Sequence, residues 1–396
     1  MRMFDLQLRT GALAIAATAA LAGPAVAQGA KTPIKIGALF ELTGVFASSG
    51  VYGAKSVQAY AAAANAAGGM DGHPIEVVVV DNQSKPDVAI ASLRKLVNED
   101  KVHAVICCNN SPIAIALKPL SKQLGVPVFA AGQSPDVINP PEQAEFMFRP
   151  NFPVDTSLRQ TLEAIKKSGT KSVAFLGVNN AYGTSAGKII TTMAPEVGLA
   201  LTGSQFFEAA STDVKAQLTL LRSGRPDAIV VYAIGPQATL VSKNLQELAF
   251  TAPVYHSMGA ANQEFVRDGG TAVEGSHVSA SVAMVPVAEL PANHPVYKLA
   301  KQYSDAWQST NKMAGDEFGR GQWDAMNIIA LALEAKKPDL SKPEEARRAL
   351  RDGIETVRGY AGLTGTFNFS PQDHSGLGTS GGALLVIRNG KFTLAN

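Results

Sequence analysis

Hydrophobic and polar positions alternate along the chain in two patterns, short apolar runs and longer segments with apolar residues three and four positions apart. The run Ile34–Phe40 follows Pro33 and ends at a polar turn, which is typical of a strand buried in a parallel sheet. Residues 51–67 are rich in alanine with helical spacing and stop at two glycines, and residues 75–80 form a second β-branched run. These segments predict a strand–helix–strand unit, whose loops leave the ligand-binding edge of an open α/β sheet. The phosphate fingerprint G-x-G-x-x-G is absent from them.

The same alternation continues and predicts two lobes. We expect further strands at 103–107, 126–130, 172–178, 201–207, 227–232 and 254–255, with helices at 87–98, 112–124, 155–167, 181–194, 213–222 and 236–248. Strands at 146–150 and 274–281 are expected to cross between the lobes. Three helices, at 294–310, 318–335 and 342–351, are expected to return to the first lobe. A last pair of strands is expected at 366–369 and 383–387. The predicted fold class is α/β, with two doubly wound parallel-sheet lobes joined by three crossings. The first lobe comprises 28–148 plus 280–362 and the second 149–279 plus 363–396, and such a pair of lobes can close on a ligand by a hinge.

The length and charge of the chain narrow the classes of partner. At 396 residues, two domains are expected, and a net charge of +2 gives no reason to expect nucleic acid or an anionic membrane surface as a partner. Arg2 and Arg9, the apolar stretch 11–22 and the small-residue site Ala25-Val26-Ala27 predict a signal peptide, 1–27, cleaved before Gln28. The alternative is a membrane anchor, for which the apolar stretch is short. We therefore expect an exported protein.

Cysteine and histidine usage gives no sign of a metal site or cofactor. Cys107 and Cys108 are the only cysteines, and a bridge between neighbours is strained, so we expect two reduced, buried thiols. The six histidines are scattered without ligand spacing.

One stretch carries a family resemblance. Its order is a strand, an L-T-G turn, an alanine-rich helix, N-A-A-G-G-M-D-G at 65–72, a strand, an aspartate and K-P-D at 85–87. This order resembles the periplasmic solute-binding proteins of the branched-chain amino-acid (Leu/Ile/Val) type, and the similarity runs through the whole mature chain. The resemblance implies the type I, Venus-flytrap form of the two-lobed fold, no enzymatic activity, and delivery of a small ligand by a monomer to the permease of an ABC importer.

Serines at the ends of two predicted strands are the first candidates for the site. Ser111 and Ser134 each follow a strand, and Ser111 directly precedes a helix, so free N–H groups and a hydroxyl can hold a carboxylate there. The alternative is plain helix capping. The resemblance implies that Ser111, Gly132 and Ser134 bind the ligand carboxylate, with Ser49 in the first loop. It also implies that Tyr182, in a Y-G turn of the second lobe, lines the pocket, where its ring can cover an apolar ligand and its hydroxyl can bond to it. The alternative is a loop tyrosine packed on its own lobe.

The residues expected to meet the other end of the ligand differ from those of the family. Amino-acid binders of this type carry an acidic residue after the strand matching 254–255, where it holds the ligand's ammonium group, but this chain reads Ser257-Met258-Gly259. Ile234 is apolar where a polar aromatic residue is common in the family, and Phe318 can add aromatic surface. An unpartnered buried ammonium is expensive, so an aromatic or other apolar carboxylate competes with an amino acid as the expected ligand.

Two observations bear on that choice. The segment 364–376 resembles family members that bind aromatic carboxylates. If the loop is aligned a few residues away, Glu264 or Asp268 would meet an ammonium instead.

Two other function classes remain open at this stage. A ligand-sensing receptor can use the same two lobes. The sequence Gly183-Thr184-Ser185-Ala186-Gly187 matches the G-x-S-x-G pattern of serine hydrolases, although Ser185 is expected inside a helix rather than at the apex of a turn.

Overall fold

The computed structural model describes residues 31–312, 315–378 and 382–395. The expected signal peptide, 1–27, lies outside these ranges. Contacts group Thr32–Asn396 as one compact unit. Within the described part of the chain, no helix combines the length and apolar character needed to cross a membrane.

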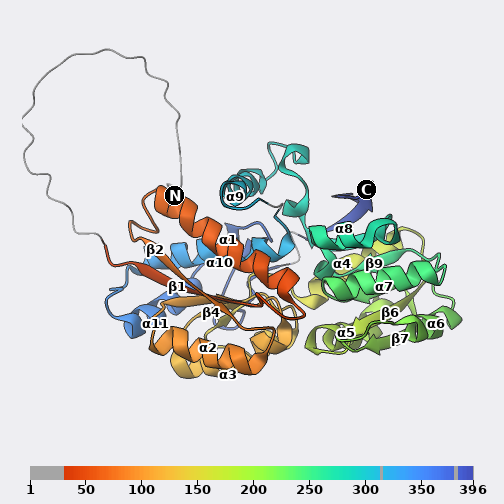
Figure 1. Cartoon of the computed structure of the whole chain (residues 1–396), viewed down its shortest axis with the longest axis horizontal. Coiled ribbons are helices and arrows are strands. Elements are labelled where there is room, and N and C mark those ends of the chain that lie inside the picture. The colour runs from red at the N-terminus through yellow and green to blue at the C-terminus, as the bar shows by residue number, and fades with distance from the viewer. Residues whose placement is uncertain (1–30, 313–314, 379–381, 396) are drawn as a thin grey trace, which may run out of the picture. The chain divides into compact units, whose positions relative to one another are not determined.

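A five-stranded parallel sheet forms the centre of the first lobe, in the order β2-β1-β3-β4-β5. Its strands are β1 (Ile34–Phe40), β2 (Ile75–Asp81), β3 (Ala104–Cys107), β4 (Val128–Ala130) and β5 (Met147–Phe148). Figure 1 shows α1 (Ala47–Ala66) and α10 (Glu317–Lys336) on one side of this sheet and α2 (Pro86–Asn98) and α3 (Ser111–Leu124) on the other. Helix α11 (Pro343–Ile354) packs on α10. The carboxyl ends of β1, β3 and β4 therefore lie at one edge of the lobe.

A seven-stranded sheet forms the centre of the second lobe, in the order β14-β13-β10-β9-β8-β6-β7. Its strands are β6 (Ser172–Val178), β7 (Ala200–Phe207), β8 (Ala228–Tyr232), β9 (Val254–His256), β10 (His277–Ser281), β13 (Gly382–Arg388) and β14 (Lys391–Leu394). The neighbouring strands β7, β6, β8, β9 and β10 pair in parallel. Strand β13 is antiparallel to both of its neighbours, β10 and β14.

The helices of the second lobe are α4 (Val154–Lys167), α5 (Ala181–Glu196), α6 (Lys215–Ser223), α7 (Pro236–Glu247) and α8 (Gln263–Gly269). Helix α4 packs on α5, and α7 packs on α6 and α8. Helix α9 (Tyr297–Thr310) packs on α1 of the first lobe.

The predicted fold class is confirmed, and three elements differ from expectation. The strand expected at 146–150 is the edge strand β5 of the first sheet, and the strand expected at 274–281 is β10 of the second sheet. The last two expected strands do not pair with each other. Instead, β12 (Thr366–Phe367) pairs with β11 (Tyr360–Ala361), and β13 pairs with β14, a strand after the Asn389-Gly390 turn that was not predicted. The lobe boundaries stay a prediction.

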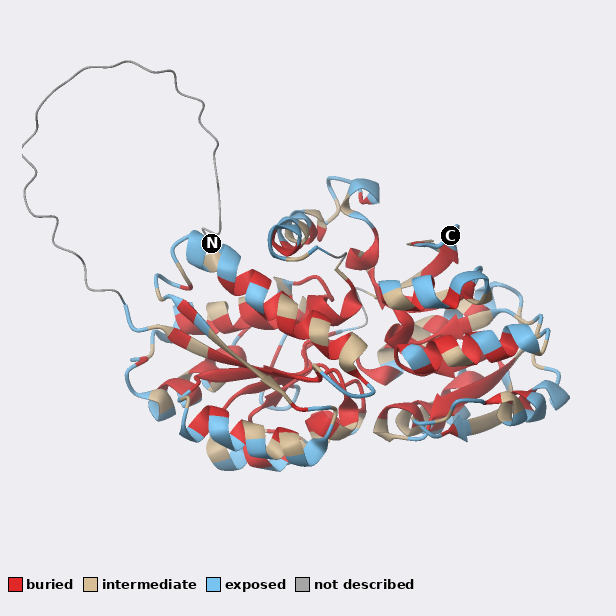
Figure 2. Ribbon diagram, viewed as in Figure 1, coloured by how far each residue is buried: buried red, intermediate tan, exposed pale blue. Residues whose placement is uncertain are grey.

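Burial follows the patterns that define the strands. Six of the seven residues of β1 are buried, as are all residues of β3, β4 and β8. In Figure 2, the central strands of both sheets are mostly buried, the edge strands β2 and β7 are mostly intermediate, and exposed residues lie on the outer faces of the helices. Continuous apolar runs thus lie between two helical layers, as expected for parallel sheets.

A buried carboxylate anchors the third crossing to the first lobe. Asp324 of α10 accepts hydrogen bonds from the backbone N–H groups of Leu363 and Thr364, at 2.8 and 2.9 Å, and from the Thr364 hydroxyl at 2.8 Å. Burial raises the pKa of Asp324 to about 7, against the opposing effect of these bonds. The chain is therefore held at 363–364 just before it returns to the second sheet.

Candidate ligand-binding site

A small cavity lies where loops from both lobes meet. It is partly open, and the space between its atoms amounts to about 280 Å³, of which some is open to solvent. The residues that line it are Asn109, Ala131, Gln133, Asn151, Tyr182, Ile234, Met258, Gly259 and Phe318. Most of them follow the carboxyl ends of β3, β4, β6, β8 and β9, the edge at which open α/β sheets bind ligands.

The second-lobe wall and Phe318 make the cavity largely apolar. Ile234, Met258 and Phe318 are each no more than 5% exposed, and Met258 places its sulfur 3.8 Å from Nε2 of Gln133 on the other lobe. The Tyr182 ring packs 5.3 Å from that of Tyr232. Such a wall suits the ring or alkyl tail of a ligand.

The hydroxyl of Tyr182 is a buried polar group without a hydrogen-bond partner among the described residues. Burial raises the pKa of Tyr182, and the nearby Ser257 side chain and Gly259 backbone lower it in part without completing a hydrogen bond. The phenol therefore stays protonated at neutral pH. It is available to donate to a ligand oxygen.

The amide side chains of the first-lobe wall are mostly engaged with the protein itself. Asn109 donates from Nδ2 to the carbonyl of Ser49 at 2.9 Å and accepts from Gln322 at 2.9 Å. Gln133 donates from Nε2 to the carbonyl of Phe152 at 2.8 Å. These bonds hold the wall rigid, and every side chain that lines the cavity is uncharged.

Asn151 lies close to helix α10. Its Nδ2 donates to the carbonyl of Ala131 at 3.3 Å, while its Oδ1 has no partner among the described residues. A Cβ atom on Gly321 would come within 2.0 Å of that Oδ1. Glycine at 321 is therefore needed to admit Asn151 beside the cavity.

The predicted carboxylate-binding serines lie directly behind the lining residues and are not among them. The Ser134 N–H donates to Oγ of Ser111 at 3.2 Å. A Cβ atom on Gly132 would come within 2.9 Å of the Cα atom of Ser111, so glycine lets the two loops approach. Ser49 is also outside the lining, and its hydroxyl donates to the carbonyl of Phe46 at 2.8 Å.

The expected role of Ser111 as the residue before the helix is wrong. Ser111 is the first residue of α3, and the cap is Asn110, whose Oδ1 accepts from the N–H of Ile113 at 3.3 Å. Among the described residues, the Ser111 hydroxyl accepts one hydrogen bond, from Ser134, and a hydroxyl can also donate one proton. That proton has no acceptor among the described residues, although the hydroxyl does not itself line the cavity.

The acidic residues that could have met an ammonium line a different cavity. Glu264 and Asp268 border a neighbouring space together with Ser48 and Arg267. Met258 occupies the wall of the site itself. Met258, at the position that the sequence analysis matched to the family's acidic residue, therefore lies in the wall of the cavity, whereas Glu264 and Asp268 do not line it.

A buried carboxyl group lies behind Asn109. Glu41 is fully buried, and one of its oxygens lies 3.4 Å from the N–H of Asn109. Burial raises the pKa of Glu41 to about 7, and the neighbouring backbone N–H groups oppose the shift.

The whole-chain comparisons agree with this architecture. A family model described as "Periplasmic binding protein" matches residues 33–390. The chain belongs to the periplasmic binding proteins. It is of the Leu/Ile/Val type that the sequence resembles, and proteins of this family bind solutes and are exported.

Curated relatives of this periplasmic binding protein are distant. It is 28% identical over 231 residues to the Leu/Ile/Val-binding protein homolog 7 of Brucella abortus, a match that covers 55% of each chain. It thus spans about half the length of the first such relatives. It is 23% identical to the leucine-, isoleucine-, valine-, threonine- and alanine-binding protein of Pseudomonas aeruginosa, over 88% of this chain and 90% of that one.

Solved structures of similar fold cover more of this periplasmic binding protein. An extracellular ligand-binding receptor from Rhodopseudomonas palustris is 27% identical, with a TM-score of 0.85 over 92% of this chain and all of the other. A solute-binding protein from the same species, solved in complex with benzoate, has a TM-score of 0.77 over 92% of this chain and 96% of the other. The second is 19% identical and shows the fold alone.

The structure adds site residues that sequence reasoning missed in this binding protein. Asn109 and Gln133 are neighbours of the predicted serines, so their position at strand ends could have revealed them. Asn151 follows the short edge strand β5 and gave no local signal. It reaches the cavity only because α10 packs against it.

Two other expectations are resolved by the structure. Cys107 and Cys108 are joined as a disulfide rather than kept as two thiols, with their Cα atoms 3.7 Å apart. Ser185 lies within α5, where its hydroxyl donates to the carbonyl of Ala181 at 2.6 Å, and no described histidine hydrogen-bonds to it. No cluster of three or more His, Cys, Asp or Glu suited to a metal occurs among the described residues.

Proposed function

We propose that this protein captures a small carboxylate with an apolar or aromatic tail between its two lobes and delivers it to an ABC importer. The observation that carries the proposal is Met258 in the wall of the cavity, where amino-acid binders of this type hold an ammonium with a carboxylate. A buried ammonium without an anion costs several kcal/mol, whereas an apolar tail gains about 25 cal/mol per Å² of surface that it buries.

Hydrogen-bond donors are available at the other end of the ligand. The Ser111 hydroxyl has a free proton, and it begins α3, whose first N–H groups favour an anion. The Tyr182 hydroxyl is unpaired. The donors of Ser111 and the first turn of α3 support a carboxylate at the first-lobe end of the cavity, beside Gln133 and Asn109, and the Tyr182 hydroxyl offers a further donor from the second-lobe side, near Ser257 and Gly259.

A panel of ligands tests the proposal. Thermal-shift assays and calorimetric titration should compare benzoate, 3-phenylpropanoate and 2-oxo-4-methylpentanoate with leucine, isoleucine and valine. We expect the three acids without an ammonium to stabilise the protein at least as well as leucine. Stabilisation by the three amino acids alone would overturn the proposal.

Export and partner are part of the same proposal. We infer that a signal peptide, 1–27, is removed and that a monomer meets the importer's permease in the periplasm. N-terminal sequencing of periplasmic material should begin at or next to Gln28, and a start elsewhere would contradict the predicted cleavage site.

A further inference from the structure

Arg149 is a buried cation directly behind the loop that contains Gln133 and Ser134. It is 2% exposed, and its Nη1 donates to the carbonyl of Gln133 at 3.1 Å and to that of Ser134 at 3.0 Å. Its Nε donates to the Ser375 hydroxyl at 3.4 Å. Burial lowers the pKa of Arg149 from 12.5 to about 10, so the guanidinium remains charged at neutral pH.

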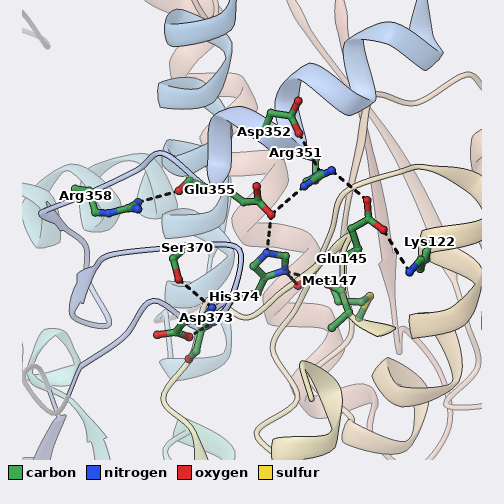
Figure 3. Close-up of polar contacts among 12 residues, drawn as sticks. Lys122, Glu145, Met147, Arg351, Asp352, Glu355, Arg358, Ser370, Asp373 and His374 are labelled. Atoms are coloured by element: carbon green, nitrogen blue, oxygen red, sulfur yellow. Dashed lines mark hydrogen bonds and ion pairs between the residues drawn. The ribbon is translucent and has the colours of Figure 1, made fainter. Parts of the chain in front are cut away.

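No carboxylate neutralises this charge by contact. Among the described residues, Arg149 forms no ion pair, and the acidic groups whose fields reach it, Asp155 and Asp373, are exposed. Arg351 shows the usual arrangement, since it pairs with Glu145 at 3.1 Å and Glu355 at 3.0 Å (Figure 3). A buried, uncompensated cation favours an anion in its surroundings, because charges are weakly screened there.

A chain of hydrogen bonds leads from Arg149 towards the cavity. Arg149 donates to the carbonyl of the peptide group that joins Gln133 to Ser134. The N–H of the same peptide group belongs to Ser134 and donates to Oγ of Ser111 at 3.2 Å. Arg149 also donates to the carbonyl of Ser134, but the peptide group that joins Ser134 to Pro135 has no N–H. The Ser134 N–H is therefore the backbone donor that Arg149 polarises in this loop. Hydrogen bonds in such a chain strengthen one another.

We propose that Arg149 determines the preference of this site for a carboxylate over an uncharged ligand of the same shape, by polarising the Gln133–Ser134 peptide and, through it, the Ser111 hydroxyl. The inference rests on the proposed function and names the residue that sets its charge selectivity. Arg149 does not line the cavity, so it acts as a positioning residue through the Gln133–Ser134 peptide and the Ser111 hydroxyl.

The framework around Arg149 holds it in place independently of the loop. The backbone N–H of Arg149 donates to the carbonyl of His374 at 2.9 Å. The His374 ring stacks on Phe148 with 4.3 Å between centroids and bonds to Glu355 and to the carbonyl of Met147 (Figure 3). A changed side chain at position 149 should therefore leave the backbone where it is.

A purely structural role makes a different prediction. If Arg149 only fastens the loop, its loss weakens binding of charged and uncharged ligands alike. If it sets the charge preference, its loss weakens binding of the acid selectively. The ratio of the two affinities separates the roles, because loop disorder alone does not change it.

The experiment measures that ratio in the full mature chain. Calorimetric titration gives Kd for 3-phenylpropanoate and 3-phenylpropanamide, and for benzoate and benzamide, in wild type, Arg149→Gln and Arg149→Lys. Glutamine can still donate to one carbonyl, and lysine keeps the charge. We expect the acid-to-amide preference to fall about ten-fold in Arg149→Gln and to be largely kept in Arg149→Lys, with amide affinity changed by less than about three-fold.

Arg347→Gln is the matched control. Arg347 is also buried and donates to two carbonyls, those of Val102 at 2.8 Å and Val97 at 2.9 Å, but it lies on α11 away from the cavity. Its replacement should lower the melting temperature without changing the ligand ratio. An unchanged ratio in Arg149→Gln, or equal losses for acid and amide, would overturn the inference while leaving the proposed function intact. A wild-type protein that binds none of the acids would overturn both.

Discussion

The hydroxyl of Ser134 lies 3.0 Å from that of Ser185, and this contact joins the loop after β4 to helix α5 of the other lobe. Ser185 gives its own proton to the carbonyl of Ala181. It must therefore accept from Ser134, whose proton is then used between the lobes. While this contact is made, the Ser134 hydroxyl has no second proton for a ligand, and its predicted role in ligand binding stays a prediction.

Replacing Ser185 by alanine should weaken ligand binding about five-fold, because one neutral hydrogen bond is worth about 1 kcal/mol. The bond exists only while the lobes touch, so the effect should appear as faster ligand dissociation in stopped-flow measurements. Thr184→Ala is the control, since Thr184 bonds only to the carbonyl of Asn180 in its own helix. Equal dissociation rates for Ser185→Ala and wild type would remove this contact from closure.

Replacing Ser111 by alanine removes a donor to a charged acceptor. The loss of roughly 1.5–3 kcal/mol corresponds to about a ten- to hundred-fold lower affinity for the preferred acid. Stability should fall by about 1–3 kcal/mol, because the buried Ser134 N–H loses its acceptor, while Asn110 still caps α3. Ser121→Ala, which removes a hydroxyl bonded to the carbonyl of Lys118 in the same helix, should bind normally. Unchanged affinity in Ser111→Ala, measured by calorimetry, would exclude Ser111 from the site.

Replacing Met258 by glutamate should move the ligand preference towards amino acids. The new carboxylate can pair with an ammonium, and it repels an apolar acid from the same wall. The affinity for leucine relative to 3-phenylpropanoate is expected to rise at least ten-fold, a change of about 1.4 kcal/mol. Met258→Gln has similar size without charge and should not change the ratio. A ratio that is the same in both variants would show that the wall at 258 does not meet the ligand's ammonium end.

Glu41 should make the stability of the protein depend on pH. Its pKa is raised from 4.5 to about 7 in the fold, mainly by burial, so the folded chain holds a proton that the unfolded chain releases between these values. The stability that Glu41 contributes is full below about pH 4.5 and is lost as the pH rises through about 7. Glu41→Gln avoids this loss. It should be more stable than wild type at pH 8, by up to roughly 3 kcal/mol, with the difference shrinking towards pH 5.

Chemical denaturation at pH 5 and pH 8 measures this difference. Glu76→Gln, at an exposed position of β2, shows what removing one surface carboxylate does to the same curves. If Glu41→Gln and wild type differ equally at both pH values, the raised pKa of Glu41 is wrong.

The order of strands and helices was determined by the sequence itself. Strands such as Ile34–Phe40 and Ser172–Val178 are continuous apolar runs, and helices such as α3 carry a proline in the first turn and a glycine after the last residue. These signals depend on neighbours a few positions away, and the two-lobed α/β class follows from their alternation. Where the signal was short, as at the four-residue strand β14, the element was not predicted.

Only the tertiary structure decided which residues meet at the site. Met258 rather than Glu264 faces the cavity because of how the loop after β9 folds, and Asn151 reaches it because Gly321 of another helix leaves room. Arg149 is a charged residue, and no pattern in its neighbouring sequence shows that its side chain is buried against the backbone of Ser134. Such placements arise from packing between segments as many as 170 residues apart, as for Asn151 and Gly321, and local periodicity carries no information about it.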